Sequence, residues 1–287
     1  MIKLNNPNYD FEEAIDECIY GIVGNDELRY KVINNKPALI DFGNQYSKVA
    51  GIGKLYSIAP INTDVENDPN VIDTLKKSDL VKLYDQYFVP ENKAARKIYD
   101  SLLNSAQEKC PFCGGIGTPR NLDHFLPKAH FPQFSVLPYN LVPSCRDCNM
   151  DGKAQSFAIK PDEQIIQPYV DNPRFFIEQW IYCEYSIEDN DEIGVFNYFT
   201  NPPEIWDPID KNRVIKHFCD FNLAKRYSTK AAEQLGIIRM QIRKMQESHL
   251  PSDAIINILL QPGVDAAPFP NHWQKSMYQA LINYYHP

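Results

Sequence analysis

The sequence has no long uncharged hydrophobic run and none of the features of a secreted protein. No segment reaches the ~18 consecutive apolar residues that a membrane-spanning helix needs. Residues 1–21 do not show the basic and then apolar layout of a secretory signal. The seven cysteines of this 287-residue chain do not form the dense pattern of a secreted disulfide scaffold. These absences predict a cytoplasmic protein that does not associate with membranes.

A net charge of −8 argues at first against a nucleic-acid partner, but the charge is unevenly distributed. Residues 109–160 carry six Lys or Arg against three acids, and residues 211–244 carry nine against two. Residues 171–210 reverse the sign, with ten acids and the single Arg174. Local potential decides where a phosphate backbone docks. The basic regions are therefore candidate nucleic-acid surfaces. Three roles are open for the acidic region. It can be a docking surface for a protein partner, it can electrostatically shield the basic regions until a partner binds, or it can be a solvated surface without a specific role.

The chain divides into three regions by its residue patterns. Residues 1–105 show the apolar periodicity of helices, and residues 161–287 are again mostly helical. In the third region, Phe175–Ile187 alternates as a strand or two, and residues 207–246 predict two helices that break near Asp220–Asn222. Residues 106–160 are rich in Pro, Gly and Asn and contain few apolar residues at helical spacing. We expect metal ligation to supply the stability that this middle region lacks.

Two C-x-x-C pairs in the middle region are the strongest signal in the sequence. They are Cys110 with Cys113 and Cys145 with Cys148, and 31 residues separate the pairs. Each pair presents two thiolates to one ion, and two pairs complete the tetrahedral shell of a structural zinc site with no open position for chemistry. The alternative is four unrelated buried cysteines, which the paired spacing disfavours. The other three cysteines are isolated and fit small buried side chains.

The loop between the cysteine pairs carries oxygen and imidazole groups that suit phosphodiester hydrolysis. The candidates are Asp123, His124, Asn140, Asn149 and Lys153. Mg²⁺ is held by one or two protein oxygens together with waters and the substrate phosphate. Asp123 and Asn149 can supply these oxygens, and His124 can accept a proton from the attacking water. Lys128, Arg146 and Lys153 are candidates to neutralise the phosphate.

At these residues the chain resembles a known family. The order of "CPFC", "LDHFLPK", "YNLVPSC" and "CRDCNMDGK" resembles the HNH, or ββα-metal, nuclease superfamily in its zinc-stapled form. The resemblance covers residues 109–155 and implies a mainly α protein with a small ββα-metal module inserted between helical segments. These motifs together with the helical flanking regions also resemble a bacterial anti-phage subgroup of Septu type, in which a partner ATPase sometimes accompanies the nuclease.

The resemblance assigns a role to each matching residue. The four cysteines would bind structural zinc, His124 would be the general base, and Asn140 would orient the histidine. Asp123 and Asn149 would ligate a catalytic Mg²⁺ or Mn²⁺, which makes this an H-N-N variant. Lys153 departs from the pattern, because it follows Asn149 by four residues where relatives commonly have three. His130 is not at a motif position and is interpreted as a surface or packing residue.

These features support three hypotheses. The leading one is a metal-dependent endonuclease that cuts DNA in anti-phage defence or a mobile-element system, although the metal chemistry itself does not distinguish DNA from RNA. The second is a zinc-stapled nucleic-acid-binding module without activity alone. The third is a subunit of a larger assembly with a partner such as an ATPase. Under the first, the helical basic region offers a second DNA contact through Lys225, Arg226, Arg239 and Arg243. A solvated amphipathic helix is the alternative for that region.

Overall fold

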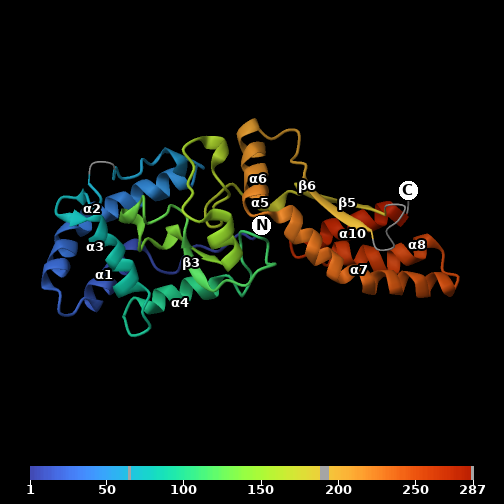
Figure 1. The fold of residues 1–287 in the computed structure, drawn as a ribbon, viewed down its shortest axis with the longest axis horizontal. Helices are drawn as coiled ribbons and strands as arrows, with labels where there is room; N and C mark the ends of the chain where they lie inside the picture. The colour runs from blue at the N-terminus through green and yellow to red at the C-terminus, as the bar shows by residue number, and fades with distance from the viewer. Residues whose placement is uncertain (64–65, 188–193, 286–287) are drawn as a thin grey trace.

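The computed structural model describes residues 1–63, 66–187 and 194–285. Among these residues the protein is about half helical, with three two-stranded antiparallel sheets. Figure 1 shows an elongated molecule, in which helices α1 to α4 surround the hairpin of strands β3 and β4 at one end. Strands β5 and β6 and helices α7 to α10 form the other end, and the short α5 and helix α6 lie between the two.

The N-terminal part is helical, as its apolar periodicity predicted. Its elements are α1 (Phe11–Gly21), α2 (Asp26–Ala50), η1 (Leu55–Ser57), β1 (Asn70–Ile72), β2 (Leu75–Lys76), α3 (Lys77–Lys82), η2 (Leu83–Phe88) and α4 (Arg96–Ser105). Helix α1 begins at Asp10, whose side chain accepts from the Glu13 N–H while the Glu13 carboxylate accepts from the Asp10 N–H. This reciprocal pair satisfies two backbone donors that a helix start would otherwise leave unpaired.

The middle part is a hairpin followed by a helical turn. Strand β3 (Asn121–His124) pairs antiparallel with β4 (Leu141–Ser144), so that Asn121 lies opposite Ser144 and His124 opposite Leu141. The 3₁₀ turns η3 (Pro132–Phe134) and η4 (Pro138–Asn140) connect the strands, and each begins with a proline whose fixed φ suits that position. The π-helical turn η5 (Asp147–Lys153) follows β4. This register places the cysteine pairs at one end of the hairpin and His124 at the other.

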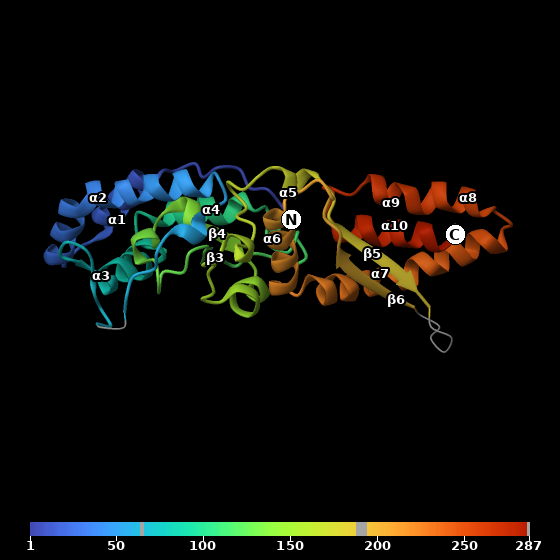
Figure 2. The same cartoon turned by 90° about the horizontal axis from the view of Figure 1, so that it is seen from above.

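The C-terminal part is an arm built on a second hairpin. Its elements are η6 (Pro161–Glu163), α5 (Arg174–Ile177), β5 (Ile181–Ser186), β6 (Val195–Thr200), α6 (Pro208–Asp220), α7 (Leu223–Glu247), α8 (Ser252–Ile255), η7 (Ile256–Leu260), α9 (Gln261–Asp265) and α10 (Trp273–Tyr285). Alternate residues of β5 are buried against α10, and β6 packs on α7 (Figure 2). The predicted helix break is confirmed, because Asn222 adopts a left-handed conformation with φ 49° between α6 and α7.

One continuous hydrophobic cluster runs through both ends of the molecule and includes all four cysteines of the two pairs. The cluster joins the arm to the middle part through α6 and the first turns of α7. Within the described ranges, no helix combines the length and the hydropathy that crossing a membrane requires.

Candidate metal centre and active site

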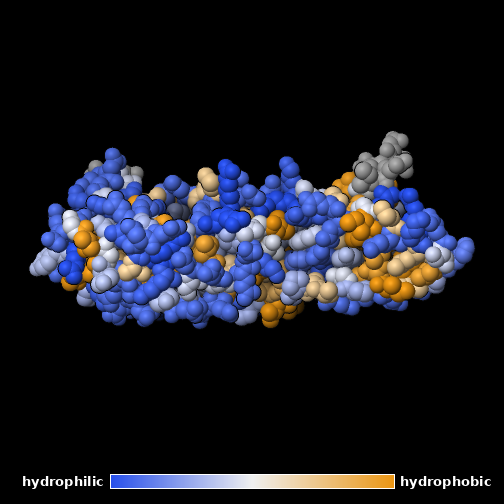
Figure 3. Space-filling model, turned by 90° about the horizontal axis from the view of Figure 1, so that it is seen from below, coloured by the Kyte–Doolittle hydropathy of each residue, from blue (hydrophilic) through white to orange (hydrophobic). Residues whose placement is uncertain are grey.

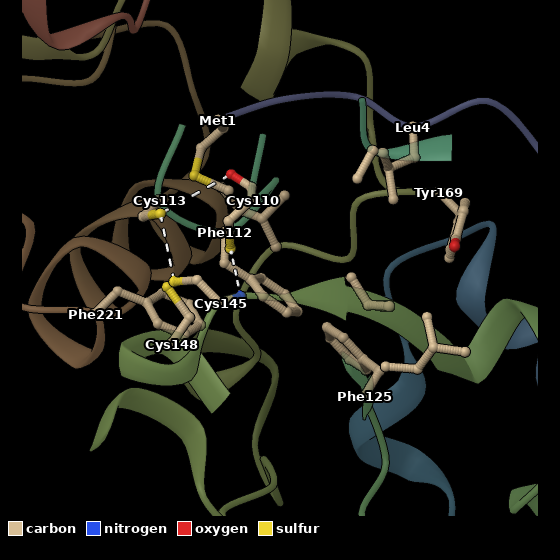
Figure 4. Close-up of a cluster of buried hydrophobic side chains, with 14 of the residues drawn as sticks. Met1, Leu4, Cys110, Phe112, Cys113, Phe125, Cys145, Cys148, Tyr169 and Phe221 are labelled. Atoms are coloured by element: carbon tan, nitrogen blue, oxygen red, sulfur yellow. Dashed lines mark hydrogen bonds between the residues drawn. The ribbon is translucent and has the colours of Figure 1, made fainter. Parts of the chain in front are cut away.

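The four paired cysteines converge on one buried point (Figure 4). Their sulfur atoms all lie within 4.8 Å of one another, and the Cys113 and Cys145 sulfurs are 3.9 Å apart. A tetrahedral zinc site with Zn–S bonds of about 2.3 Å separates its sulfurs by about 3.8 Å. All four thiols are free of disulfides. The cluster can therefore hold a metal such as zinc, and the predicted pairing of the two C-x-x-C motifs in space is confirmed.

A cation from the arm faces this cluster. The Arg226 guanidinium donates to the sulfur of Cys148 at 3.3 Å and to that of Cys145 at 3.6 Å, and it lies 3.3 Å from an Asp147 carboxylate oxygen. Four thiolates on one zinc ion would carry a net charge of −2, which the half-buried guanidinium would partly compensate. Arg226 was predicted to contact DNA, but in the structure its guanidinium points to the cysteines.

His124, at the end of β3, is buried and held as a neutral ring. Its Nε2 lies 2.8 Å from the Ser135 carbonyl oxygen, and the Tyr84 ring packs edge-on against it with centroids 4.4 Å apart. A carbonyl oxygen only accepts, so Nε2 carries the proton and Nδ1 keeps its lone pair. Burial lowers the pKa of His124 to about 3. The imidazole is thus oriented and unprotonated at neutral pH.

The Asp123 carboxylate lies beside a buried lysine. Asp123 is 6% exposed, its Oδ2 has no hydrogen-bond partner, and the Lys153 ammonium is 3.6 Å from that oxygen. The Lys153 ammonium also donates to the His124 carbonyl oxygen at 2.6 Å. Burial raises the pKa of Asp123 to about 6 and lowers that of Lys153. An orphaned carboxylate oxygen of this kind is a fitting ligand for a hard divalent cation.

Lys153 is only 3% exposed, which differs from the expected phosphate-facing lysine. The physical reason lies in the backbone. The Ala154 N–H donates to the Asn149 carbonyl at 2.8 Å, an i to i+5 bond that accommodates the extra residue in a wider π-helical turn. Ala154 then takes φ 47° and ψ −120°, a conformation that a residue with a Cβ rarely adopts. This turn directs the Lys153 side chain inward toward β3.

The two asparagines occupy different environments. Asn140 is fully buried, and its side chain accepts from the Leu126 N–H at 2.7 Å and donates to the carbonyls of Leu126 at 3.0 Å and Phe134 at 3.2 Å. These bonds close the loop that follows His124. Asn149 lies half-buried on η5, directly after Cys148. The turn that holds Cys148 therefore also fixes the position of Asn149.

A pocket of about 320 Å³ opens over the Asp123–His124 pair. It is lined by Lys77, Val81, Asp123, His124, Pro127, Lys128, Ala129, Ala154 and Gln155. Lys77, and Tyr84 and Ser135 that contact the histidine, could not be identified from the sequence. No local motif marks them, and the fold brings Lys77 to the pocket and Tyr84 to the His124 ring from more than thirty residues upstream.

The structure places the other candidate cations on separate surfaces. Lys128 borders the pocket and pairs with Asp85, with its ammonium 4.8 Å from the centre of the Tyr84 ring. Arg146, Lys225 and Arg243 are exposed, and Arg239 is half-buried on α7. These four do not line the pocket over His124.

The acidic region is partly neutralised inside the protein. Asp171 is 2% exposed and forms a two-pronged ion pair with Arg213, and Arg174 lies 3.1 Å from an Asp210 oxygen. Four of its ten acids, which fall in residues 188–193, lie outside the described residues. Asp171 is therefore a structural partner of Arg213 and is not available at the surface.

Comparison with known proteins gives one full-length and one partial similarity. Protein ea31 of Escherichia phage lambda is 38% identical over an alignment of 294 residues, which spans 99% of this chain and 97% of that protein. Septu protein PtuB of Bacillus thuringiensis is 37% identical over 87 residues, or 29% of this chain and 33% of that protein. No family model matches the chain. No solved structure matches it significantly.

Proposed function

We propose that this chain, which belongs to the family of phage lambda protein ea31, is a metal-dependent endonuclease of the HNH type, because His124 and the buried Asp123 line one pocket at the end of the hairpin opposite the four-cysteine cluster. It hydrolyses phosphodiester bonds in DNA, in the setting of anti-phage defence or of a mobile element. The setting is supported by the phage-encoded relative and by the partial similarity to a Septu protein.

The observation that carries the proposal is the state of His124. The ring is fixed by the Ser135 carbonyl at 2.8 Å, is neutral, and borders a pocket that Asp123 also lines. A general base must be deprotonated and must lie within reach of the proton that it accepts. A purely structural zinc loop has no need of a buried acid–imidazole pair at the pocket floor.

The residues divide the chemistry between them. Nδ1 of His124 accepts a proton from water as the water oxygen bonds to phosphorus and the bond to the 3′ oxygen breaks. Asp123 and Asn149 would supply oxygens for Mg²⁺ or Mn²⁺, which would provide Lewis-acid stabilisation of the phosphate charge. A ring with a pKa of about 3 is a weak base in the free protein. The negative phosphodiester raises this pKa when it enters the pocket, because it favours the imidazolium.

The cysteine cluster has a separate role. Four sulfurs leave zinc no open position, so the zinc shapes the site and takes no part in the chemistry. It anchors both the turn that carries Asn149 and the beginning of the hairpin that carries Asp123.

The test is cleavage of a supercoiled plasmid in Mg²⁺ and in Mn²⁺ by the wild type and by His124→Ala, with the zinc content of each protein measured. We expect nicking by the wild type, loss of nicking in the variant and equal zinc. His130→Ala is the matched control, since His130 lies in the same loop and its ring packs on Phe157. Equal cleavage by the wild type and His124→Ala would refute the proposal.

The Lys153 ammonium beside Asp123 favours a second candidate function. A carboxylate already paired with an internal cation fits a nucleic-acid-binding subunit that is silent alone and acts within a larger assembly, for example with an ATPase. Under this alternative the purified chain binds DNA without cutting it, and cleavage begins only when the partner is added.

A further inference from the structure

We propose that the segment Lys77–Phe88, formed by α3 and η2, is one wall of the active site, and that Lys77 binds a phosphate of the substrate strand. This inference rests on the proposed nuclease function and identifies a residue far outside the resemblance, which covers only residues 109–155. The site is then shared between the N-terminal helical part and the hairpin.

The wall is tied to the catalytic histidine through a short chain of contacts. The Ser135 hydroxyl donates to the Leu80 carbonyl of α3 at 2.7 Å, and the Ser135 carbonyl accepts from His124 at 2.8 Å. Helix α3 therefore positions the residue that sets the tautomer of the base. A shift of α3 would move Ser135 and would turn the ring.

Two side chains of η2 reinforce this wall. The Tyr84 ring covers His124, and its hydroxyl lies 3.5 Å from the Leu122 carbonyl oxygen of β3. Asp85 pairs with Lys128 on the opposite side of the pocket mouth. These contacts fix the wall relative to both the strand and the loop, so the pocket keeps its shape before a substrate arrives.

Lys77 is the cation that this wall presents to the pocket. It borders the pocket together with Asp123 and His124. Among the residues that the structure describes, Lys77 forms no salt bridge, whereas Lys128 is paired with Asp85. Lys77 lies within electrostatic range of the Asp68 carboxylate but forms no salt bridge with it, so its ammonium can contact a phosphate that enters beside His124. A cation next to the reacting phosphate also favours the charge that builds up in the transition state.

The charge and the size of the pocket suit a phosphodiester. Lys77, Lys128 and Asp123 border about 320 Å³ of space. Lys128 is paired with Asp85 and Asp123 with Lys153, so among the described residues Lys77 is the lining cation that no salt bridge holds. A nucleic-acid backbone carries one negative charge per phosphate, and each lysine that contacts a phosphate releases a counterion.

The test measures binding without cleavage. Lys77→Ala is made in the His124→Ala background, and fluorescence anisotropy reports the affinity for a labelled DNA duplex over a range of salt concentrations. Lys82→Ala in the same background is the control, because Lys82 belongs to the same helix and does not border the pocket. One lost phosphate contact lowers the salt slope by about 0.9 and weakens binding about eightfold in 0.1 M salt. Lys77→Arg retains the charge and should retain the affinity.

The outcomes separate this inference from the proposed function. Equal affinities and equal salt slopes for Lys77→Ala and Lys82→Ala overturn the assignment of Lys77, even if the wild type cleaves DNA in a His124-dependent way. Loss of affinity in Lys77→Ala alone supports the assignment even if the lone chain does not cut. In an active wild-type background, Lys77→Ala should raise KM several-fold with a smaller change in kcat, which a merely structural role would not produce.

Discussion

Replacing Lys153 by methionine should destabilise the protein in alkaline buffer and leave it nearly unaffected in mild acid. The ammonium is buried 3.6 Å from Asp123, so its removal leaves a buried carboxylate without a counter-charge. The pKa of Asp123 is already raised to about 6 by burial, and loss of Lys153 raises it further, because the lysine is the main group that lowers it. The variant must therefore protonate Asp123 in order to fold.

The magnitude follows from the pH. A pKa raised above the unfolded value gives stability that is full at low pH and is lost as the pH rises through the folded pKa. At pH 5 the carboxyl is mostly protonated in both proteins, so the substitution removes little. At pH 8 the solution is about two units above the wild-type pKa of about 6, and each unit is worth about 1.4 kcal/mol. Lys153→Met should then cost up to about 3 kcal/mol in the free energy of unfolding.

Urea unfolding of the two proteins at pH 5 and pH 8 checks this prediction. Lys128→Met is the control, because Lys128 forms a partly exposed pair and should cost less than about 1 kcal/mol at both pH values. The double variant Asp123→Asn/Lys153→Met should recover most of the loss at pH 8, since neither charge remains. The same loss for Lys153→Met at both pH values would refute the reasoning, because the cost would then come from packing alone.

Three further substitutions test the metal centre and its connections. Gly117→Ala should lower the zinc content, because the added Cβ would lie 2.5 Å from the Cys145 sulfur. Gly236→Ala is the control. Its Cβ meets nothing within 4 Å, and the substitution should stabilise helix α7 by up to about 1 kcal/mol. Arg226→Ala should release zinc to a chelator about tenfold faster than the wild type, with Arg243→Ala unchanged, as colour development with a zinc-binding dye would show. His217 is buried with its pKa lowered to about 3, so it contributes stability that is full above pH ~6.5 and is lost in acid. The variant His217→Gln should reduce the loss of unfolding free energy between pH 7 and pH 4 by up to about 3 kcal/mol.

The features that could be predicted from the sequence are those encoded by local spacing. Two residues between paired cysteines suffice to form a metal knuckle, so the convergence of Cys110, Cys113, Cys145 and Cys148 follows from the pattern. The helices around the break at Asp220–Asn222 also follow, because their apolar periodicity is regular on both sides of it. In these cases the chemistry that decides the structure lies within a few residues of the motif.

The features that could not be predicted depend on contacts between distant residues. Neither Lys77 nor Ser135 carries a motif, and their places near His124 arise only when α3 packs on the hairpin. The directions of Lys153 and Arg226 are a similar case. A basic residue in a basic region is expected to contact a nucleic-acid phosphate. In the folded protein, however, Lys153 lies beside Asp123 and Arg226 beside the cysteine sulfurs. A phosphate would have to displace these internal partners. Residue composition alone does not reveal such internal partners.

Helix α7 gives the proposed enzyme a fixed reach. Its 25 residues span about 37 Å, which is close to one turn of B-form DNA. Lys225 and Arg243 are exposed and lie 18 residues apart, five full helical turns, so they share one side of the helix at a separation of about 27 Å. Arg226 fastens the first turn of α7 to the cysteine cluster, and the second half of the helix carries the exposed Ile237 and Met240. Figure 3 shows an apolar area on the end of the molecule that holds the C-terminal helices. A duplex that contacted both Lys225 and Arg243 along α7 would have to be at least about eight base pairs long, because the two cations are about 27 Å apart.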